Sequence, residues 1–194
     1  GRKAEKVMRD AEPGDMADVA GPARVRPRHG DEDLLASRGT SSGIRCLRIG
    51  ALDSDAVAAD LRVAERIDVD VLIVPKATPE GLRRLPGTRP IVAIVETPAG
   101  LQAAHEVAAA PRVRALMLGL VDLSAALGLV ARDDGLELLH ARSTLVLASA
   151  AAGLLAPFDG PRVNFTDEAR LESEVALVRA LGFGGKACIH PLQV

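Results

Sequence analysis

The segment Ile91–Gly100 reads IVAIVETPAG, so that five aliphatic residues run directly into an acid. The β-branched residues of Ile91–Val95 favour a strand that is buried on both faces, as in a parallel sheet covered by helices. Glu96 ends this run, and Pro98 and Gly100 predict an immediate turn. An acid in this position is either a polar stop signal or a functional carboxylate, and the rest of the chain distinguishes the two.

On both sides of this segment, short β-rich runs alternate with helical patterns. We expect strands at 46–49, 69–74, 91–95, 115–120, 154–158 and 187–189, and helices at 55–66, 79–84, 100–109, 123–127, 135–152 and 168–181. Alternating strands and helices predict an α/β fold with a parallel sheet. Periodicity alone leaves an open sheet and a closed barrel as alternatives.

The first 45 residues differ in composition from the remainder. Residues 13–43 have scattered Gly, Pro, Arg and Asp with no long apolar run, which predicts irregular structure. Short helices are expected at 2–11 and 31–37. We therefore divide the chain into an irregular N-terminal segment, 1–45, and a partial α/β domain, 46–194. Because the chain begins with Gly1 and stops directly after a strand-like segment, we expect a fragment of a longer protein.

The composition of the chain excludes several classes of protein. A length of 194 residues suits one domain with a substantial core, and a net charge of −2 gives no field that attracts nucleic acid or an anionic membrane. With three Phe and no Trp or Tyr, platforms for stacking bases are not expected. The apolar runs are too short to span a bilayer. Cys46 and Cys188 lack metal-ligand spacing, which favours reduced thiols in a cytoplasmic protein.

Polar residues stand where the expected strands end, namely Arg48, Lys76, Glu96, Asp122 and His190. Asp122 follows Glu96 by 26 residues (122 − 96), about the length of one β–loop–α repeat. Successive parallel strands point the same way, so both acids are predicted at one carboxyl-end mouth, where α/β barrels hold their active sites.

Two carboxylates at one mouth suit a hard divalent cation such as Mg²⁺, which leaves its other positions to water and substrate oxygens. Arg48 and Lys76 would add positive charge for an anionic substrate. As the alternative, Asp122 caps a helix that begins at Leu123, and the two basic residues are solvated strand ends.

The remaining polar residues of the motifs are interpreted mainly as structural. His190 is either a general base or a structural histidine, and its place after an aliphatic run favours the structural interpretation. Lys186 is expected at the amino end of the last strand, and Cys188 inside the sheet. His140 and Arg142 are expected to be surface or interface groups.

Six motifs occur in order along the chain: VPK at 74–76, IVETPAG at 94–100, LGLVDLSAALG at 118–128, HARSTLVLASAAAGL at 140–154, APFDG at 156–160 and LGFGGKACIHPLQV at 181–194. Together they resemble the citrate lyase beta-subunit family of CoA-ester lyases, within the wider HpcH/HpaI aldolase superfamily. The resemblance runs from about Cys46 to Val194.

The resemblance implies a TIM-type barrel in a cytoplasmic homo-oligomer, a trimer or hexamer, with Mg²⁺ held by Glu96 and Asp122. It also implies a substrate-binding and catalytic arginine at Arg48. We expect Lys76 and the loop residues Thr97, Pro98 and Gly100 to contact the substrate, a CoA ester or 2-oxo acid. The implied reaction is Mg²⁺-dependent cleavage of a 3-hydroxyacyl-CoA ester, of the citryl-CoA or malyl-CoA type, to an acyl-CoA and a 2-oxo acid.

The chain also departs from the family pattern. Only six of the eight barrel strands can be counted, Gly50 stands where the family often has Asn, and Val121 replaces an acid that commonly precedes the metal-binding Asp. Two alternatives therefore stay open. One is a catalytically inactive fragment or scaffold of the same fold, and the other is a metal-dependent aldolase that releases pyruvate without CoA.

Overall fold

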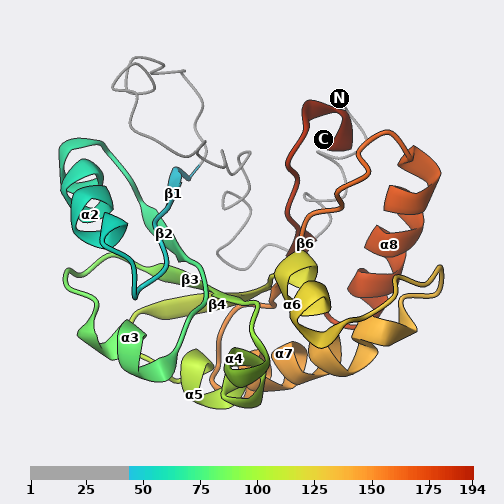
Figure 1. The fold of residues 1–194 in the computed structure, drawn as a ribbon, viewed down its shortest axis with the longest axis horizontal. Coiled ribbons are helices and arrows are strands. Elements are labelled where there is room, and N and C mark those ends of the chain that lie inside the picture. The colour runs from blue at the N-terminus through green and yellow to red at the C-terminus, as the bar shows by residue number, and fades with distance from the viewer. Residues whose placement is uncertain (1–43) are drawn as a thin grey trace.

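The computed structural model describes residues 44–194, which form one parallel sheet of six strands with helices between them (Figure 1). The strands follow one another in sequence order, and each pairs in parallel with the next. They are β1 (Cys46–Arg48), β2 (Val71–Val74), β3 (Ile91–Val95), β4 (Val113–Leu118), β5 (Phe158–Asp159) and β6 (Gly185–Lys186). The expected helices at 2–11 and 31–37, and the irregular segment 13–43, lie outside the described residues. The predicted division at residue 45 stays a prediction.

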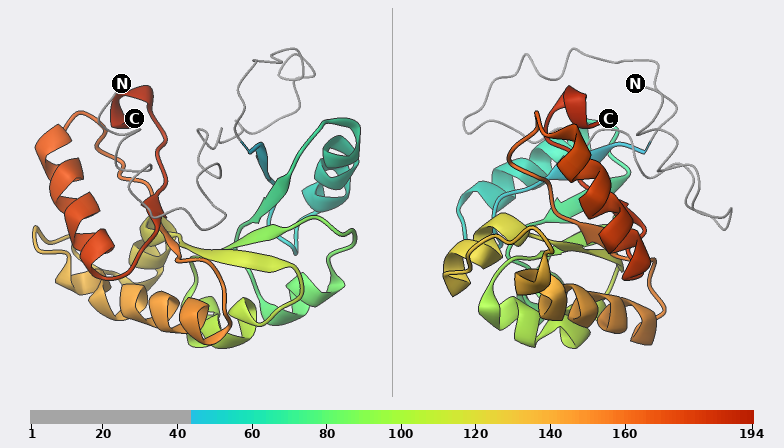
Figure 2. Two further views of the ribbon diagram at one scale, coloured as in Figure 1. Left: turned by 180° about the vertical axis from the view of Figure 1, so that it is seen from behind. Right: turned by 90° about the vertical axis from the view of Figure 1, so that its right-hand side faces the viewer.

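Most helices lie along the convex side of the curled sheet, from α2 at one end to α8 at the other, whereas α6 lies at the carboxyl end of β4 (Figures 1 and 2). They are α2 (Ala56–Arg66), α3 (Pro79–Arg84), α4 (Pro98–Gln102), α5 (Ala104–Ala108), α6 (Leu120–Leu127), α7 (Leu139–Ala151) and α8 (Glu168–Ala180), with short 3₁₀ turns η2 (Leu136–Leu138) and η3 (Pro191–Gln193). The predicted α/β fold is confirmed, and the arrangement is a half-barrel consistent with an incomplete TIM-type barrel. Eight strands are not found within residues 44–194.

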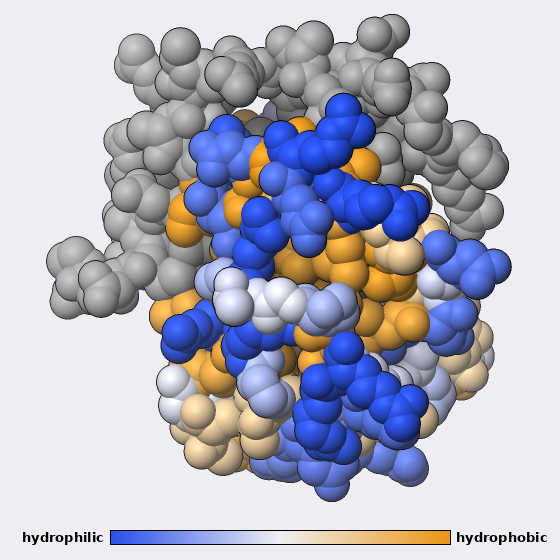
Figure 3. Space-filling view, turned by 90° about the vertical axis from the view of Figure 1, so that its left-hand side faces the viewer, coloured by the Kyte–Doolittle hydropathy of each residue, from blue (hydrophilic) through white to orange (hydrophobic). Residues whose placement is uncertain are grey.

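The continuous aliphatic runs are explained by burial on both faces of the sheet. Every residue of β2 and β3 is buried. On the convex face, Leu72 and Val74 join the main core under the helices, whereas Ile73 and Ile94 belong to a second, smaller cluster on the opposite face. Each fully buried aliphatic side chain contributes about 1.5–3 kcal/mol relative to an exposed one. The outer face on the α2 side is largely hydrophilic, with apolar side chains visible between the polar ones (Figure 3).

The same Thr-Pro dipeptide starts two helices at the carboxyl ends of neighbouring strands. Thr78 caps α3 by accepting a hydrogen bond from the N–H of Gly81, and Thr97 caps α4 by accepting one from the N–H of Gly100. Proline occupies the first helical position in both cases, where its missing N–H costs nothing. A Thr side chain in this role stabilises a helix by about 1 kcal/mol.

Several predicted boundaries were wrong. β4 spans Val113–Leu118, rather than 115–120, because Gly119 ends the strand and Leu120 begins α6. The last strand ends at Lys186, so that residues 187–189 follow the strand instead of forming it. The helix expected at 100–109 is divided into α4 and α5 at Ala103. None of the helices within residues 44–194 has the length and apolar character needed to cross a membrane.

Candidate active site

A cavity of about 260 Å³ lies at the carboxyl ends of the strands. Its walls hold the three charged residues that the sequence predicts as catalytic, Arg48, Glu96 and Asp122, which come from β1 and from the segments after β3 and β4. The other described residues that line it are mainly apolar: Cys46, Ile73, Ile94, Met117, Leu118, Gly119, Leu120, Val121, Pro161, Ala187, Cys188 and Ile189. Side chains that are more than 70 residues apart in the sequence thus meet in one cavity.

Glu96 is fixed by the strand that precedes it and by the neighbouring loop. It follows β3 directly, and its residue is only 6% exposed. One carboxylate oxygen, Oε1, accepts a hydrogen bond of 2.9 Å from the backbone N–H of Lys76. Lys76 adopts a left-handed backbone with φ of 47°, an unfavourable conformation for a residue with a side chain. The strained turn after β2 therefore directs an N–H group at the acid.

Gly119 makes room for the Glu96 side chain. Its N–H donates a hydrogen bond of 2.9 Å to the carbonyl of Val95, so the end of β4 lies directly beside Glu96. A Cβ atom on Gly119 would lie 2.2 Å from Cβ and 2.6 Å from Oε2 of Glu96. No side chain larger than hydrogen fits there. No local pattern in the sequence marks Gly119 as a site residue, because the need for glycine comes from its contact with Glu96 at the end of the neighbouring strand.

Asp122 lies in the first turn of α6, three residues after the N-cap residue Gly119. The alternative in which Asp122 caps a helix that begins at Leu123 is wrong, because the helix begins at Leu120 and has no side-chain cap. The carboxylate is exposed and lines the cavity. An acid in the first turn of a helix interacts favourably with the helix dipole.

The electrostatics of the cavity couple these charges. Burial raises the pKa of Glu96 above its usual value, the Lys76 N–H lowers it, and the charge of Asp122 raises it again. The positive charges of Arg48 and Lys76 lower the same pKa by smaller amounts, and the net shift is upward. Two acids therefore repel each other across the cavity, with a guanidinium near enough to offset part of the repulsion.

The other predicted substrate-binding residues lie at the margin of the cavity. Lys76 is exposed and contacts Glu96 through its backbone, while its side chain is not among the lining residues. Thr97, Pro98 and Gly100 build the first turn of α4, with Thr97 as its N-cap. A Cβ atom on Gly100 would lie 2.9 Å from Oγ1 of Thr97, so a larger residue would crowd the hydroxyl that caps the helix. Their contact with a substrate stays a prediction.

The donor groups at this cavity fit a hard divalent cation. Glu96 and Asp122 offer carboxylate oxygens, the ligands that Mg²⁺ prefers, and their mutual repulsion is what a cation would relieve. Among residues 44–194, no three His, Cys, Asp or Glu side chains gather closely enough to hold a metal by themselves. A cation held here would thus take two protein carboxylates and complete its shell with water and substrate, as Mg²⁺ commonly does.

Replacing Gly119 by Ala should disturb the site more than the fold. The added methyl group would displace the Glu96 side chain, and we expect Mg²⁺ affinity to fall by about ten-fold or more, with a loss of stability of about 1–3 kcal/mol from overpacking. Calorimetric titration with Mg²⁺ and thermal unfolding measure the two effects. Gly184→Ala is the matched control, because its Cβ would meet Ala156 outside the cavity at 3.2 Å. Unchanged Mg²⁺ affinity in Gly119→Ala would contradict this role.

A buried cluster of charges joins β5, β6 and α7. Asp159 is 0% exposed and pairs with two cations, Arg142 and Lys186, which are also buried. The distance from Nζ of Lys186 to Oδ2 of Asp159 is 2.6 Å, and that from Nε of Arg142 to Oδ1 of Asp159 is 3.2 Å. Two expectations were therefore wrong. Arg142 is a core residue of α7, not a surface group, and Lys186 is the last residue of β6, not its first.

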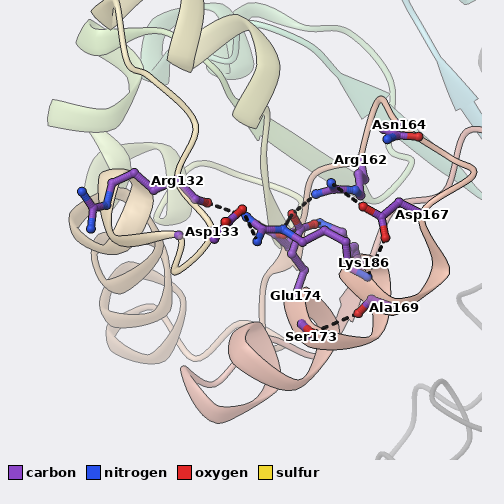
Figure 4. A network of polar contacts seen from close by, with 12 residues as sticks. Arg132, Asp133, Arg162, Asn164, Asp167, Ala169, Ser173, Glu174 and Lys186 are labelled. Atoms are coloured by element: carbon purple, nitrogen blue, oxygen red, sulfur yellow. Dashed lines mark hydrogen bonds and ion pairs between the residues drawn. The ribbon is translucent and has the colours of Figure 1, made fainter.

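The cluster extends to α8 through Glu174 (Figure 4). Glu174 contacts Lys186 with a distance of 3.4 Å between Oε2 and Nζ, and it also pairs with Arg162 and Arg170. Arg170 in turn donates to Oδ1 of Asp133 at 2.7 Å. These ion pairs join α8 to β6 and to the loop before α7. They hold the segment after β6, which lines the cavity, against the rest of the domain.

His190 and the two cysteines have structural surroundings. Nδ1 of His190 accepts a hydrogen bond of 3.2 Å from the N–H of Leu192, and the imidazole stacks on Phe165 with 4.0 Å between ring centroids. Cys188 follows β6 instead of lying inside the sheet, so that prediction was wrong, and both it and Cys46 line the cavity. Burial raises the pKa of both thiols, which disfavours the reactive thiolate.

The chain matches the sequence profile of the HpcH/HpaI aldolase/citrate lyase family over residues 2–191. Among curated proteins, a (3S)-malyl-CoA thioesterase from Cereibacter sphaeroides is 32% identical over 99% of this chain and 69% of the relative. The citrate lyase subunit beta of Escherichia coli is 34% identical over 76% of this chain and 54% of the relative.

Solved structures agree with these matches. The citrate lyase beta subunit of Mycobacterium tuberculosis, complexed with oxaloacetate and magnesium, has a TM-score of 0.70 and 34% identity, over 77% of this chain and 69% of that one. RipC from Yersinia pestis has the same TM-score and 32% identity, over 77% of this chain and 72% of that one. Sequence and fold lead to one assignment: this chain belongs to the HpcH/HpaI aldolase/citrate lyase family.

Proposed function

We propose that this chain catalyses the Mg²⁺-dependent cleavage of a 3-hydroxyacyl-CoA ester to an acyl-CoA and a 2-oxo acid. The observation that carries the proposal is the meeting of Arg48, Glu96 and Asp122 in one cavity at the carboxyl ends of the strands. Relatives solved with magnesium and oxaloacetate, or with magnesium, acetoacetate and coenzyme A, support the same class of ligand.

Glu96 and Asp122 would hold the cation through their carboxylate oxygens. A bound Mg²⁺ supplies Lewis acidity toward the oxygen that becomes the carbonyl of the 2-oxo acid. Lys76 keeps Glu96 in place through its backbone N–H, and Gly119 leaves the space that the acid needs. The fixed geometry means that little reorganisation is needed when substrate binds.

Arg48 is the group suited to the anionic fragment. As the bond between C2 and C3 of the acyl chain breaks, the electron pair moves onto the thioester and forms an enolate. The proton lost from the 3-hydroxyl group is matched by one gained at C2, so the reaction is balanced without any further reactant. A guanidinium in the same cavity would stabilise this negative charge, and electrostatic stabilisation of this kind commonly contributes most to the catalytic rate.

The test is to incubate the protein and Mg²⁺ with malyl-CoA, citryl-CoA and methylmalyl-CoA, and to follow acyl-CoA release. EDTA should stop the reaction, and Arg48→Ala should slow it by about 10²-fold or more, as for loss of a group that stabilises an oxyanion. Arg45→Ala is the matched control, since Arg45 is exposed, pairs with Asp68 and does not line the cavity. No release from any ester by a folded, Mg²⁺-loaded protein would favour an inactive scaffold.

Thioester hydrolysis is the second candidate, because one relative that matches 99% of this chain is a (3S)-malyl-CoA thioesterase. The products separate the two reactions. Cleavage of malyl-CoA between carbons gives acetyl-CoA and glyoxylate, whereas hydrolysis gives free CoA and malate. Turnover that does not require CoA would instead favour the metal-dependent pyruvate aldolase.

The homo-oligomeric state stays a prediction, to be measured by sedimentation.

A further inference from the structure

We propose that Lys186 is a positioning residue that keeps Asp122 in register with Glu96, acting through Gly160 and the turn between β4 and α6. The inference rests on the proposed function, because it concerns the metal site that this function requires. It follows from a chain of short contacts that runs from the buried charge cluster to the cavity.

Lys186 fastens the end of β5 from within the core. Its side chain is 4% exposed, and Nζ donates a hydrogen bond of 2.8 Å to the carbonyl of Gly160, the first residue after β5. The same ammonium group donates to Oδ2 of Asp159 at 2.6 Å. The N–H of Ala187 adds a bond of 2.9 Å to the carbonyl of Asp159. The segments after β5 and β6 are therefore held together where they reach the cavity, which Pro161 and Ala187 line.

Gly160 lies directly against the turn between β4 and α6. A Cβ atom on Gly160 would lie 2.4 Å from the carbonyl oxygen of Leu118 and 3.0 Å from Cγ of Leu120. Leu118 is the last residue of β4, and Leu120 is the first residue of α6. Glycine allows the two backbones to approach this closely. A shift of Gly160 would therefore move the turn or leave a gap beside it.

The turn contacts Glu96 on the side away from Gly160, because β4 lies between β3 and β5 in the sheet. A Cβ atom on Gly119, within the turn, would lie 2.2 Å from Cβ of Glu96. Asp122 follows in the first turn of α6. The position of the turn thus sets where Asp122 lies relative to Glu96. Two ligands of one cation need a fixed separation, which outer contacts of this kind supply at metal sites.

Arg142 provides the natural comparison with Lys186. It is also buried and pairs with the same carboxylate, with 3.2 Å between its Nε and Oδ1 of Asp159. Within residues 44–194, its hydrogen bonds go to Asp159 and to the carbonyl of Gly135, which precedes α7. The two cations of the cluster therefore differ in one respect that matters for the cavity. Lys186 bonds to the segment that contacts the turn, and Arg142 does not.

The test is calorimetric titration of Mg²⁺ into Lys186→Met and its matched control, Arg142→Met, at a temperature at which both are folded. Each variant leaves Asp159 with one cation, so both lose stability. We expect Lys186→Met to bind Mg²⁺ about ten-fold or more weakly than the unmodified protein, as when outer groups of metal sites are lost. Arg142→Met should keep nearly full affinity. Full affinity in Lys186→Met, or equal losses in both variants, would overturn the inference.

A double variant shows whether Lys186 acts through Asp122. Asp122→Asn combined with Lys186→Met should bind Mg²⁺ little more weakly than Asp122→Asn alone, because the ligand that Lys186 positions is already lost. A purely structural role of Lys186 would instead give effects that add in full. Full additivity of the two losses would therefore contradict the positioning role.

Gly160→Ala tests the same contact without removing a charge. The added methyl group would displace the turn, and it should weaken Mg²⁺ binding in the same direction as Lys186→Met. Gly182→Ala is the control, since its φ of 101° and a Cβ contact of 3.1 Å with Val146 make it unfavourable away from the cavity. Unchanged affinity in Gly160→Ala, or a loss as large in Gly182→Ala, would show that the turn is not held in this way.

The failure of this inference is distinguishable from failure of the proposed function. If the unmodified protein binds Mg²⁺ and cleaves an ester while Lys186→Met keeps full affinity, the lyase assignment holds and the positioning role is wrong. If Lys186→Met weakens Mg²⁺ binding as expected but the unmodified protein cleaves no ester, the positioning role holds and the lyase assignment is wrong. Absence of Mg²⁺ binding to the unmodified protein would overturn both.

Discussion

Glu96→Gln should reduce Mg²⁺-dependent cleavage of CoA esters by about 10²–10³-fold or more while leaving the fold intact, since it removes the charge of a carboxylate that we propose as a metal ligand. The amide oxygen of Gln can still accept the hydrogen bond from the Lys76 N–H, so the local backbone keeps its partner. The measurement is kcat/KM from acyl-CoA release, with circular dichroism to confirm the fold.

Glu106→Gln provides the control for this substitution. Glu106 is an exposed acid on α5, on the convex side of the sheet and outside the cavity. The same chemical change there should leave turnover unaltered. If Glu96→Gln retains more than about a tenth of the activity, Glu96 is not a metal ligand, because loss of even outer groups of metal sites costs about 10–100-fold.

Asp159→Asn should lower the free energy of unfolding by about 3–5 kcal/mol, the usual cost of removing one partner from a buried ion pair. The reason is that Arg142 and Lys186, both buried, would keep their charges after losing the carboxylate between them. Asn has almost the same volume as Asp, so packing changes little. Urea unfolding monitored by circular dichroism measures the difference.

Glu80→Gln is the matched control for a lost ion pair. Glu80 pairs with Arg84 at 2.7 Å on the exposed side of α3. Exposed pairs of this spacing contribute about 0.3–0.5 kcal/mol, so the control should be close to the unmodified protein. A loss of less than 1 kcal/mol in Asp159→Asn would mean that water or relaxation satisfies the two buried cations, and that the carboxylate is not their necessary partner.

The sequence predicted the fold class well where local signals were strong. The aliphatic run at 91–95 forms β3, and the helix expected at 79–84 is α3 with the same bounds. The shortest elements were predicted least well. β5 and β6 have two residues each, so their position depends on pairing with a neighbour and on the buried Lys186, which local patterns do not record.

The candidate site was also predicted where the sequence carries a local signal and missed where it does not. The positions of Arg48, Glu96 and Asp122 at the ends of expected parallel strands predicted that they would lie at one mouth, and the structure brings them into one cavity. The role of Gly119 was missed because it depends on a contact of its backbone with Glu96. Arg142 was misjudged for a similar reason. Its partner, Asp159, lies 17 residues further along the chain, on a different element.

One measurement tests most directly whether Glu96 and Asp122 act as a single metal site. Calorimetric titration with Mg²⁺ is carried out on the unmodified protein, on Glu96→Gln and on Asp122→Asn. Two carboxylates that share one cation predict that each single variant weakens Mg²⁺ binding by about ten-fold or more, and that the double variant is little worse than either. Full Mg²⁺ affinity in both single variants would contradict the site, and with it the reaction proposed for this chain.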